Sequence, residues 1–194
     1  MSAAKIILAS TSPYRKNLLS RLRLPFSCVR PHFDESALKG TSLSPKKLAL
    51  QLAYGKAASL RDRFPEAVLV GSDQVIHFKG KLFGKPGTPE RARRQLRQLS
   101  GKQHELICSV VVLYKKKVFS HTEVIKLTLH SLTDDQIRRY VSKDKPLDCA
   151  GSYKVESLGI SLMKKIEGGD PTAIEGLPLV KLSYILRKLQ VKVP

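Results

Sequence analysis

Short apolar runs alternate with amphipathic segments along the chain, and this alternation predicts an α/β fold. Apolar runs at 6–8, 26–29 and 67–70 predict buried strands. Two longer extended segments, 104–114 and 117–130, predict a hairpin that turns at a run of three lysines. With 194 residues, the chain is expected to form a single domain, which can be divided into two lobes.

The expected helices begin at capping sequences. In Ser12-Pro13, Ser44-Pro45 and Thr88-Pro89, a hydroxyl residue suited to the N-cap precedes a proline suited to the first helical position. Thr133-Asp134-Asp135-Gln136 has the pattern of a capping box. Pro178 is expected to begin a last amphipathic helix.

The turn between the first strand and the first helix is a candidate anion site. Free backbone N–H groups and the positive end of the helix dipole favour a phosphate there. Ser10, Thr11, Ser12 and Arg15 add side-chain donors. The alternative is that the hydroxyl groups only cap the helix, since short turns of small residues are common.

A carboxylate follows the strand expected at 67–70. Asp73 is expected at the carboxyl end of that strand, where ligands bind in α/β sheets, and it could accept a proton from water or hold Mg²⁺. The alternative is an Asx-turn at the strand end. Lys56 and Lys85 could place charges on phosphate oxygens, or be ordinary surface lysines. These residues together predict an α/β enzyme that acts on a phosphorylated anion.

The chain is strongly basic, with 35 Lys and Arg residues against 16 Asp and Glu residues and a net charge of +19. Such a charge attracts polyanions. The basic residues are spread along the chain, and the densest clusters are 91–97 and 115–117. Because no basic arm, zinc finger or RNA-binding aromatic signature accompanies them, we interpret most of the charge as solvated surface and do not expect nucleic acid as the partner.

Cellular location is predicted from what the sequence lacks. The three cysteines (28, 108 and 149) form no C-x-x-C pair, which is typical of a reducing cytosol and indicates neither zinc nor disulfides. No apolar run approaches the roughly 18 residues of a membrane span, and no secretory leader is recognisable. We therefore expect a cytoplasmic protein without a membrane partner.

Six motifs, in this order and spacing, resemble the Maf family of nucleoside triphosphate pyrophosphatases across essentially the whole chain. They are L-A-S-T-S-P-Y-R-K-N-L-L, G-S-D-Q-V, G-K-P, L-S-G, D-C-A-G-S-Y-K-V-E and I-E-G-G-D-P-T-A-I-E-G-L-P-L. The resemblance implies a single Maf-like domain over 1–194. It also implies a two-lobed, elongated mixed sheet flanked by helices, of the inosine-triphosphatase type, with the nucleotide in a cleft between the lobes. The implied reaction is Mg²⁺- or Mn²⁺-dependent hydrolysis between the α- and β-phosphates.

The resemblance also assigns roles to residues. The family's catalytic aspartate falls on Asp73, and Glu35 joins Asp73 in holding the metal. The remaining phosphate-handling positions fall on Ser10, Arg15, Lys56 and Lys85. Two departures from the family pattern, Cys108-Ser109 in place of Thr-Gly and the glycine at position 55, are expected to affect only local packing.

Three positions divide the family by substrate, and here they hold Tyr14, Gln74 and Glu156, which resemble the branch that prefers N7-methyl-GTP. Tyr14 could stack on the cationic methylated base, with a bonus of roughly 0.5–2 kcal/mol. Glu156 could accept from the N1–H and N2–H₂ edge of guanine, and a pyrimidine would leave that carboxylate unpaired. The alternative for Glu156 is an ion pair with Lys154.

The leading hypothesis is thus a pyrophosphatase that removes N7-methyl-GTP from the nucleotide pool. The same reaction on dTTP, UTP or another non-canonical nucleotide is the alternative within this class. From a different class, the chain could be a basic nucleic-acid-binding or cell-division regulator on the same fold. A homodimer remains among the possible assemblies.

Overall fold

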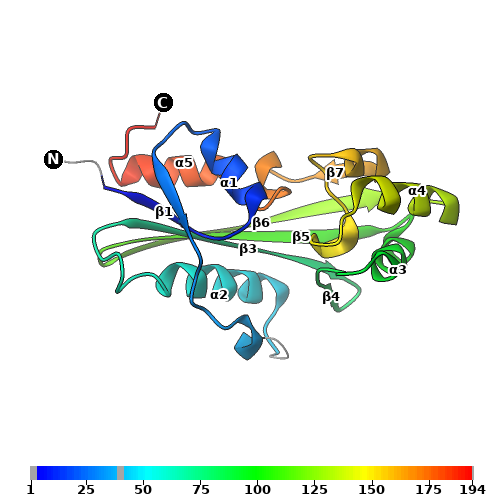
Figure 1. The fold of residues 1–194 in the computed structure, drawn as a ribbon, viewed down its shortest axis with the longest axis horizontal. Helices are drawn as coiled ribbons and strands as arrows, with labels where there is room; N and C mark the ends of the chain where they lie inside the picture. The colour runs from blue at the N-terminus through cyan, green and yellow to red at the C-terminus, as the bar shows by residue number, and fades with distance from the viewer. Residues whose placement is uncertain (1–3, 39–41, 194) are drawn as a thin grey trace. The chain divides into compact units, whose positions relative to one another are not determined.

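The computed structural model describes residues 4–38 and 42–193, and these form the seven strands and five α-helices shown in Figure 1. The strands are β1 (Ile6–Ala9), β2 (Phe26–Val29), β3 (Val68–Phe78), β4 (Lys81–Phe83), β5 (Gln103–Tyr114), β6 (Lys117–Leu129) and β7 (Met163–Glu167). The helices are α1 (Pro13–Ser20), α2 (Pro45–Ala58), α3 (Pro89–Leu99), α4 (Asp134–Asp144) and α5 (Leu179–Lys188). Short 3₁₀ turns are η1 (Glu35–Leu38), η2 (Ala150–Ser152), η3 (Leu158–Leu162) and η4 (Pro171–Ala173).

The strands form one mixed sheet in the order β2-β1-β3-β5-β6-β7, with β4 paired to β3. β1 pairs in parallel with both β2 and β3. β4 and β7 are antiparallel to their neighbours β3 and β6. The prediction of a mixed α/β sheet flanked by helices is therefore confirmed. No helix in the described part of the chain is both long and apolar enough to cross a bilayer.

The chain divides into two compact units, in agreement with the expected two lobes. The first comprises 1–73, 108–123 and 170–194, apart from the residues outside the described ranges. Successive residues of β1 alternate between its two faces: Ile6 and Leu8 pack with α1 and α5, and Ile7 and Ala9 pack with α2. Figure 1 shows α1 and α5 on one side of these strands and α2 on the other.

The second unit comprises 74–107 and 124–169. Its helices α3 and α4 pack against each other, η2 packs on α3 and η3 packs on α4. Two polar loops, 84–88 and 147–157, are joined where the amide of Gly87 donates to the carbonyl of Leu147 at 2.9 Å.

One prediction about the strands is wrong, because β3 does not end before Asp73. It continues without a break from Val68 to Phe78, so Asp73 lies inside an extended segment and not in a turn at its end. The pairing of β3 with β1, however, stops at Val70, opposite Leu8. Asp73 therefore lies just past the point where the parallel neighbour ends, within an extended strand, which removes the Asx-turn explanation.

Candidate functional site

The strand–turn–helix at 9–15 folds as its capping residues predict. Ser12 is the N-cap of α1, and its hydroxyl accepts from the amide of Arg15 at 3.4 Å. The hydroxyl of the buried Ser10 accepts from the amide of Ser12 at 3.1 Å. The capping interpretation is thus correct for Ser12, and Ser10 shapes the turn from inside.

Arg15 connects this turn to the C-terminal part of the chain. Its Nε donates to the carbonyl oxygen of Gly176 at 2.9 Å. The hydroxyl of Ser72 lies 2.8 Å from the same oxygen and 2.7 Å from the carbonyl oxygen of Ser109, and its single proton goes to one of them at a time. Because Ser72 directly precedes Asp73, the Gly176 carbonyl links the candidate phosphate-binding arginine to the candidate catalytic strand. Both Ser72 and Gly176 lie in motifs of the sequence resemblance, but the sequence assigned neither residue a role.

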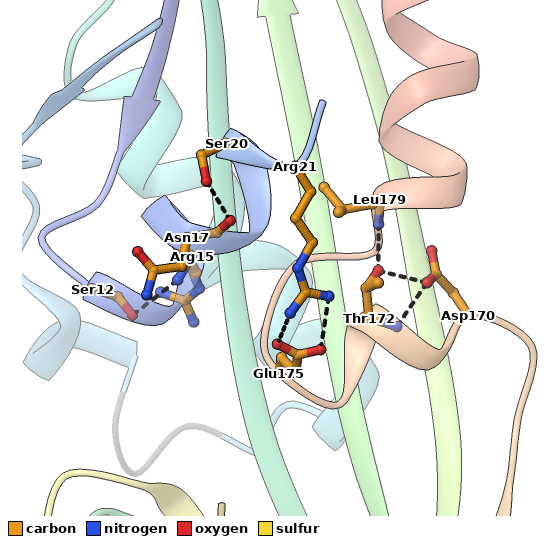
Figure 2. Close-up of polar contacts among 9 residues, drawn as sticks. All are labelled: Ser12, Arg15, Asn17, Ser20, Arg21, Asp170, Thr172, Glu175 and Leu179. Carbon is orange, nitrogen blue, oxygen red and sulfur yellow. Dashed lines mark hydrogen bonds and ion pairs between the residues drawn. The ribbon is translucent and has the colours of Figure 1, made fainter. Parts of the chain in front are cut away.

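The segment that carries Gly176 is held by the buried carboxylate of Asp170 (Figure 2). This carboxylate accepts from the amide of Thr172 at 3.0 Å and its hydroxyl at 2.6 Å, and from the amide of Val180 at 2.8 Å. The hydroxyl of Thr172 in turn accepts from the amide of Leu179 at 2.8 Å. Two N–H groups at the start of α5, which have no partner within the helix, are therefore capped by Thr172 and Asp170, and these contacts join the turn to the helix.

An ion pair ties the same segment to α1. Arg21 donates to both carboxylate oxygens of Glu175, at 3.1 and 2.8 Å, and Figure 2 shows the two groups facing each other. Such two-point pairing fixes orientation as well as distance. Glu175 precedes Gly176, whose positive φ of 111° aims its carbonyl at Arg15.

Three of the predicted site residues are in direct contact. The ammonium of Lys56, on α2, contacts the carboxylate of Asp73, on β3, and lies 3.0 Å from that of Glu35, on η1. The side chains of Lys56 and Asp73 are 9% and 11% exposed, whereas that of Glu35 is 42% exposed. A buried lysine is satisfied here by two carboxylates, which excludes the ordinary surface role considered for it.

Two glycines permit this contact. A Cβ on Gly71 would lie 2.1 Å from the carbonyl oxygen of Ala53, so only glycine lets α2 approach β3 this closely. A Cβ on Gly55 would lie 2.4 Å from the ring of Phe33, which packs directly over the helix backbone beside Lys56. The glycine at position 55 therefore has a packing role, as the sequence led us to expect.

The second departure from the family pattern also has a packing role. Cys108 is fully buried, and burial raises the pKa of its thiol to about 12, so it stays protonated near neutral pH. The Ser109 hydroxyl bonds that of Thr122 at 2.8 Å, and the Ser109 carbonyl lies within reach of Ser72.

The donors present fit a hard divalent cation bound together with a substrate. Among the described residues, no group of three or more His, Cys, Asp or Glu side chains forms a metal cage. Glu35 and Asp73, however, bring carboxylate oxygens to the same ammonium. Mg²⁺ typically takes one or two protein carboxylates and completes its shell with water and substrate phosphates, so two carboxylates suffice.

The remaining candidates divide between the two units. Tyr14 is half-buried on α1 in the first unit. In the second unit, Gln74 is half-buried on β3, and Lys85 and Glu156 are exposed in the loops 84–88 and 147–157. Their roles in phosphate and base recognition remain predictions.

Gln95, on α3, was not a candidate, yet it braces both loops of the second unit. Its amide nitrogen donates to the Gly84 carbonyl at 3.0 Å, and its amide oxygen accepts from the Ser152 hydroxyl at 2.5 Å. No sequence motif pointed to Gln95, because both partners are distant in the sequence.

Comparison with known proteins assigns nearly the whole chain to a single family. A family model described as Maf-like protein matches residues 5–189. A protein of Bdellovibrio bacteriovorus named 7-methyl-GTP pyrophosphatase is 47% identical over 186 residues, covering 96% of this chain and 97% of that protein. Proteins with the same name from Pseudomonas aeruginosa (97% of this chain, 98% of that protein) and Xanthomonas axonopodis (98% and 99%) are 44% and 45% identical. A solved Ham1 protein from Coxiella burnetii aligns with a TM-score of 0.45 and 15% identity over 95% of this chain and 99% of that one.

Proposed function

Because the chain belongs to the Maf family, we propose that it hydrolyses N7-methyl-GTP to N7-methyl-GMP and pyrophosphate. Relatives that are 44–47% identical over nearly its full length carry the name 7-methyl-GTP pyrophosphatase. The structural observation that carries the proposal is the buried contact of Lys56 with Asp73 and Glu35, because it places acidic and basic groups suited to phosphate hydrolysis together.

Water attacks the α-phosphorus, the bond to the bridging oxygen breaks, and pyrophosphate leaves with the electron pair of that bond. Asp73 accepts the proton of the attacking water, the task of a general base. Lys56 orients this carboxylate, since its ammonium contacts Asp73 directly.

Phosphate charge is neutralised mainly from the first unit. The amides at the start of α1, the hydroxyl of Ser10 and the guanidinium of Arg15 form the anion site, and Lys56 adds a cation. The family resemblance assigns Lys85 a further phosphate contact. Positioning and charge neutralisation supply most of the catalysis in phosphoryl transfer.

Glu35 and Asp73 would hold the divalent cation, Mg²⁺ or Mn²⁺. When bound, the cation would neutralise charge on the phosphate oxygens. The exposed side of Glu35 leaves this carboxylate accessible to a solvated ion.

The base is selected by three side chains. Tyr14 stacks on the cationic methylated ring, Glu156 accepts from the N1–H and N2–H₂ edge, and Gln74 bonds a remaining polar edge. A pyrimidine does not present this pair of donors to the Glu156 carboxylate, which weakens its binding by about 1–3 kcal/mol.

The test is Mg²⁺- and Mn²⁺-dependent pyrophosphate release from a panel of N7-methyl-GTP, GTP, UTP and dTTP. Wild type should give its highest kcat/KM on N7-methyl-GTP. Glu156→Gln should shift the N7-methyl-GTP/UTP ratio of kcat/KM towards UTP by roughly 10- to 100-fold. Glu66→Gln, which removes the same charge from an exposed carboxylate paired with Lys115, should leave the ratio unchanged.

Other outcomes identify the alternatives. A preference for UTP or dTTP in wild type would keep the reaction and change the substrate. Salt-sensitive binding of DNA without turnover of any nucleotide would contradict the enzyme and favour the nucleic-acid-binding alternative.

A further inference from the structure

We infer that the C-terminal end of α4 positions Glu156 for base recognition, with Tyr140, Asp144 and Ser157 as the positioning residues. The inference rests on the proposed function, since it explains how that function's selectivity is built. None of these three residues belongs to the motifs that carry the sequence resemblance.

Glu156 lies in a tight turn. The amide of Ser157 donates to the carbonyl of Lys154 at 3.2 Å, which closes the turn around the two residues between them. The side chain of Glu156 is exposed, but the backbone on each side is held by α4.

The N-terminal side of the turn is fixed through Lys154. Its amide donates to the hydroxyl of Tyr140 at 3.0 Å. Its ammonium donates to the carbonyl oxygens of Asp144 and Lys145, at 3.0 and 3.4 Å. These carbonyls lie at the negative end of the α4 dipole, where a cation is favoured.

The C-terminal side is fixed through Ser157, whose hydroxyl donates to Oδ1 of Asp144 at 2.7 Å. Gly159 closes the chain onto the same turn, because a Cβ there would lie 2.3 Å from the carbonyl oxygen of Lys154. Burial and the neighbouring Asp144 carboxylate raise the pKa of Tyr140, which keeps its hydroxyl protonated.

Both sides of the turn therefore meet on one helix end, where the Lys154 amide bonds Tyr140 and the Ser157 hydroxyl bonds Asp144. A carboxylate on such a clamped turn loses little conformational freedom when it pairs with a base edge, so more of its pairing energy appears as selectivity. The interaction of the Lys154 ammonium with the helix end shows how this lysine supports the turn that carries Glu156.

Ser157→Ala tests this attachment of the Glu156 turn to the end of α4, and Ser161→Ala is its matched control. The Ser161 hydroxyl donates within η3, to the carbonyl of Leu158 at 2.8 Å. Ser157→Ala should lower the N7-methyl-GTP/UTP ratio of kcat/KM by about three- to tenfold, and Ser161→Ala should not change it. Ser157→Thr, which restores the hydroxyl, should restore the ratio.

Tyr140→Phe is the second variant, and it removes the hydroxyl that accepts from the Lys154 amide. It should lower the same ratio at least as much, and its thermal unfolding midpoint shows whether the fold is kept. UTP turnover in each variant should stay within about twofold of wild type, because UTP does not need a positioned carboxylate.

The outcomes distinguish failure of this attachment from failure of the proposed function. If wild type prefers N7-methyl-GTP and neither Ser157→Ala nor Tyr140→Phe lowers the ratio, the positioning role of Ser157 and Tyr140 is refuted and the proposed function stands. If wild type has no preference for N7-methyl-GTP, the proposed substrate fails, and the positioning role fails with it. Equal loss on both substrates would show that Tyr140 and Ser157 are only structural, and would overturn the inference.

Discussion

Replacing the two members of the buried Lys56–Asp73 pair should affect stability very differently. Lys56→Met leaves the carboxylate of Asp73, which is 11% exposed, without its ammonium partner. Removing one partner of a buried ion pair destabilises a fold by about 3–5 kcal/mol. Asp73→Asn leaves Lys56 paired with Glu35 at 3.0 Å, so we expect a loss of only about 1–2 kcal/mol.

The loss of activity should follow the opposite order, with Asp73→Asn losing more activity than Lys56→Met. Asp73→Asn should lower kcat by about 10²–10⁴, because an amide cannot accept the proton of water. Its KM should change little, because the proposed phosphate ligands Ser10 and Arg15 are unchanged. Urea denaturation gives the free energy of unfolding, and metal-dependent pyrophosphate release gives kcat and KM.

The double variant Lys56→Met/Asp73→Asn completes the cycle. It should be less destabilised than the sum of the single changes, since no buried charge remains at either position. Equal destabilisation by the two single changes would show that Glu35 does not share the lysine. More than about a tenth of wild-type kcat in Asp73→Asn would refute the role of this carboxylate as base.

Two further predictions concern the units separately. Burial lowers the pKa of His104 to about 4, so between about pH 6.5 and 4 the unfolded chain binds a proton that the folded chain excludes. The free energy of unfolding should therefore fall by about 3 kcal/mol as the pH is lowered through this window. His104→Gln should reduce that fall, whereas the same change at the exposed His130 should not. Glu175→Gln breaks the two-point contact with Arg21 beside the Gly176 carbonyl, so KM should rise about two- to fivefold with a change in Tm of only a few degrees. An unchanged KM, or an equal rise in the control Glu90→Gln, would contradict a role for this contact in binding.

Features governed by local rules were predictable from the sequence. The hydroxyl groups of Ser12, Ser44 and Thr88 each cap a helix whose first residue is proline, and Thr133 forms the expected capping box. These contacts join residues about three positions apart, so the pattern of neighbouring residues is sufficient to predict them.

Features decided by distant partners were not predictable from local pattern. β7 (Met163–Glu167) contains two consecutive lysines and lacks an apolar alternation, and it becomes a strand because it pairs with β6. In the same way, the carbonyl that orients Arg15 belongs to a residue 161 positions away. A backbone carbonyl has no side-chain signature, so the motif that contains Gly176 did not indicate this contact.

The extension of β3 through Asp73 gives the Gly-Ser-Asp sequence its physical meaning. Successive residues of a strand point to opposite faces, so Gly71 and Asp73 face one side and Ser72 faces the other. On the first side, Gly71 admits the backbone of α2 and Asp73 meets Lys56 from the same helix. On the opposite side, Ser72 reaches the carbonyl that binds Arg15. A turn at these positions would break that alternation. The arrangement that joins the proposed base, its lysine and the proposed phosphate-binding arginine therefore depends on the strand continuing past the residue where its parallel neighbour ends.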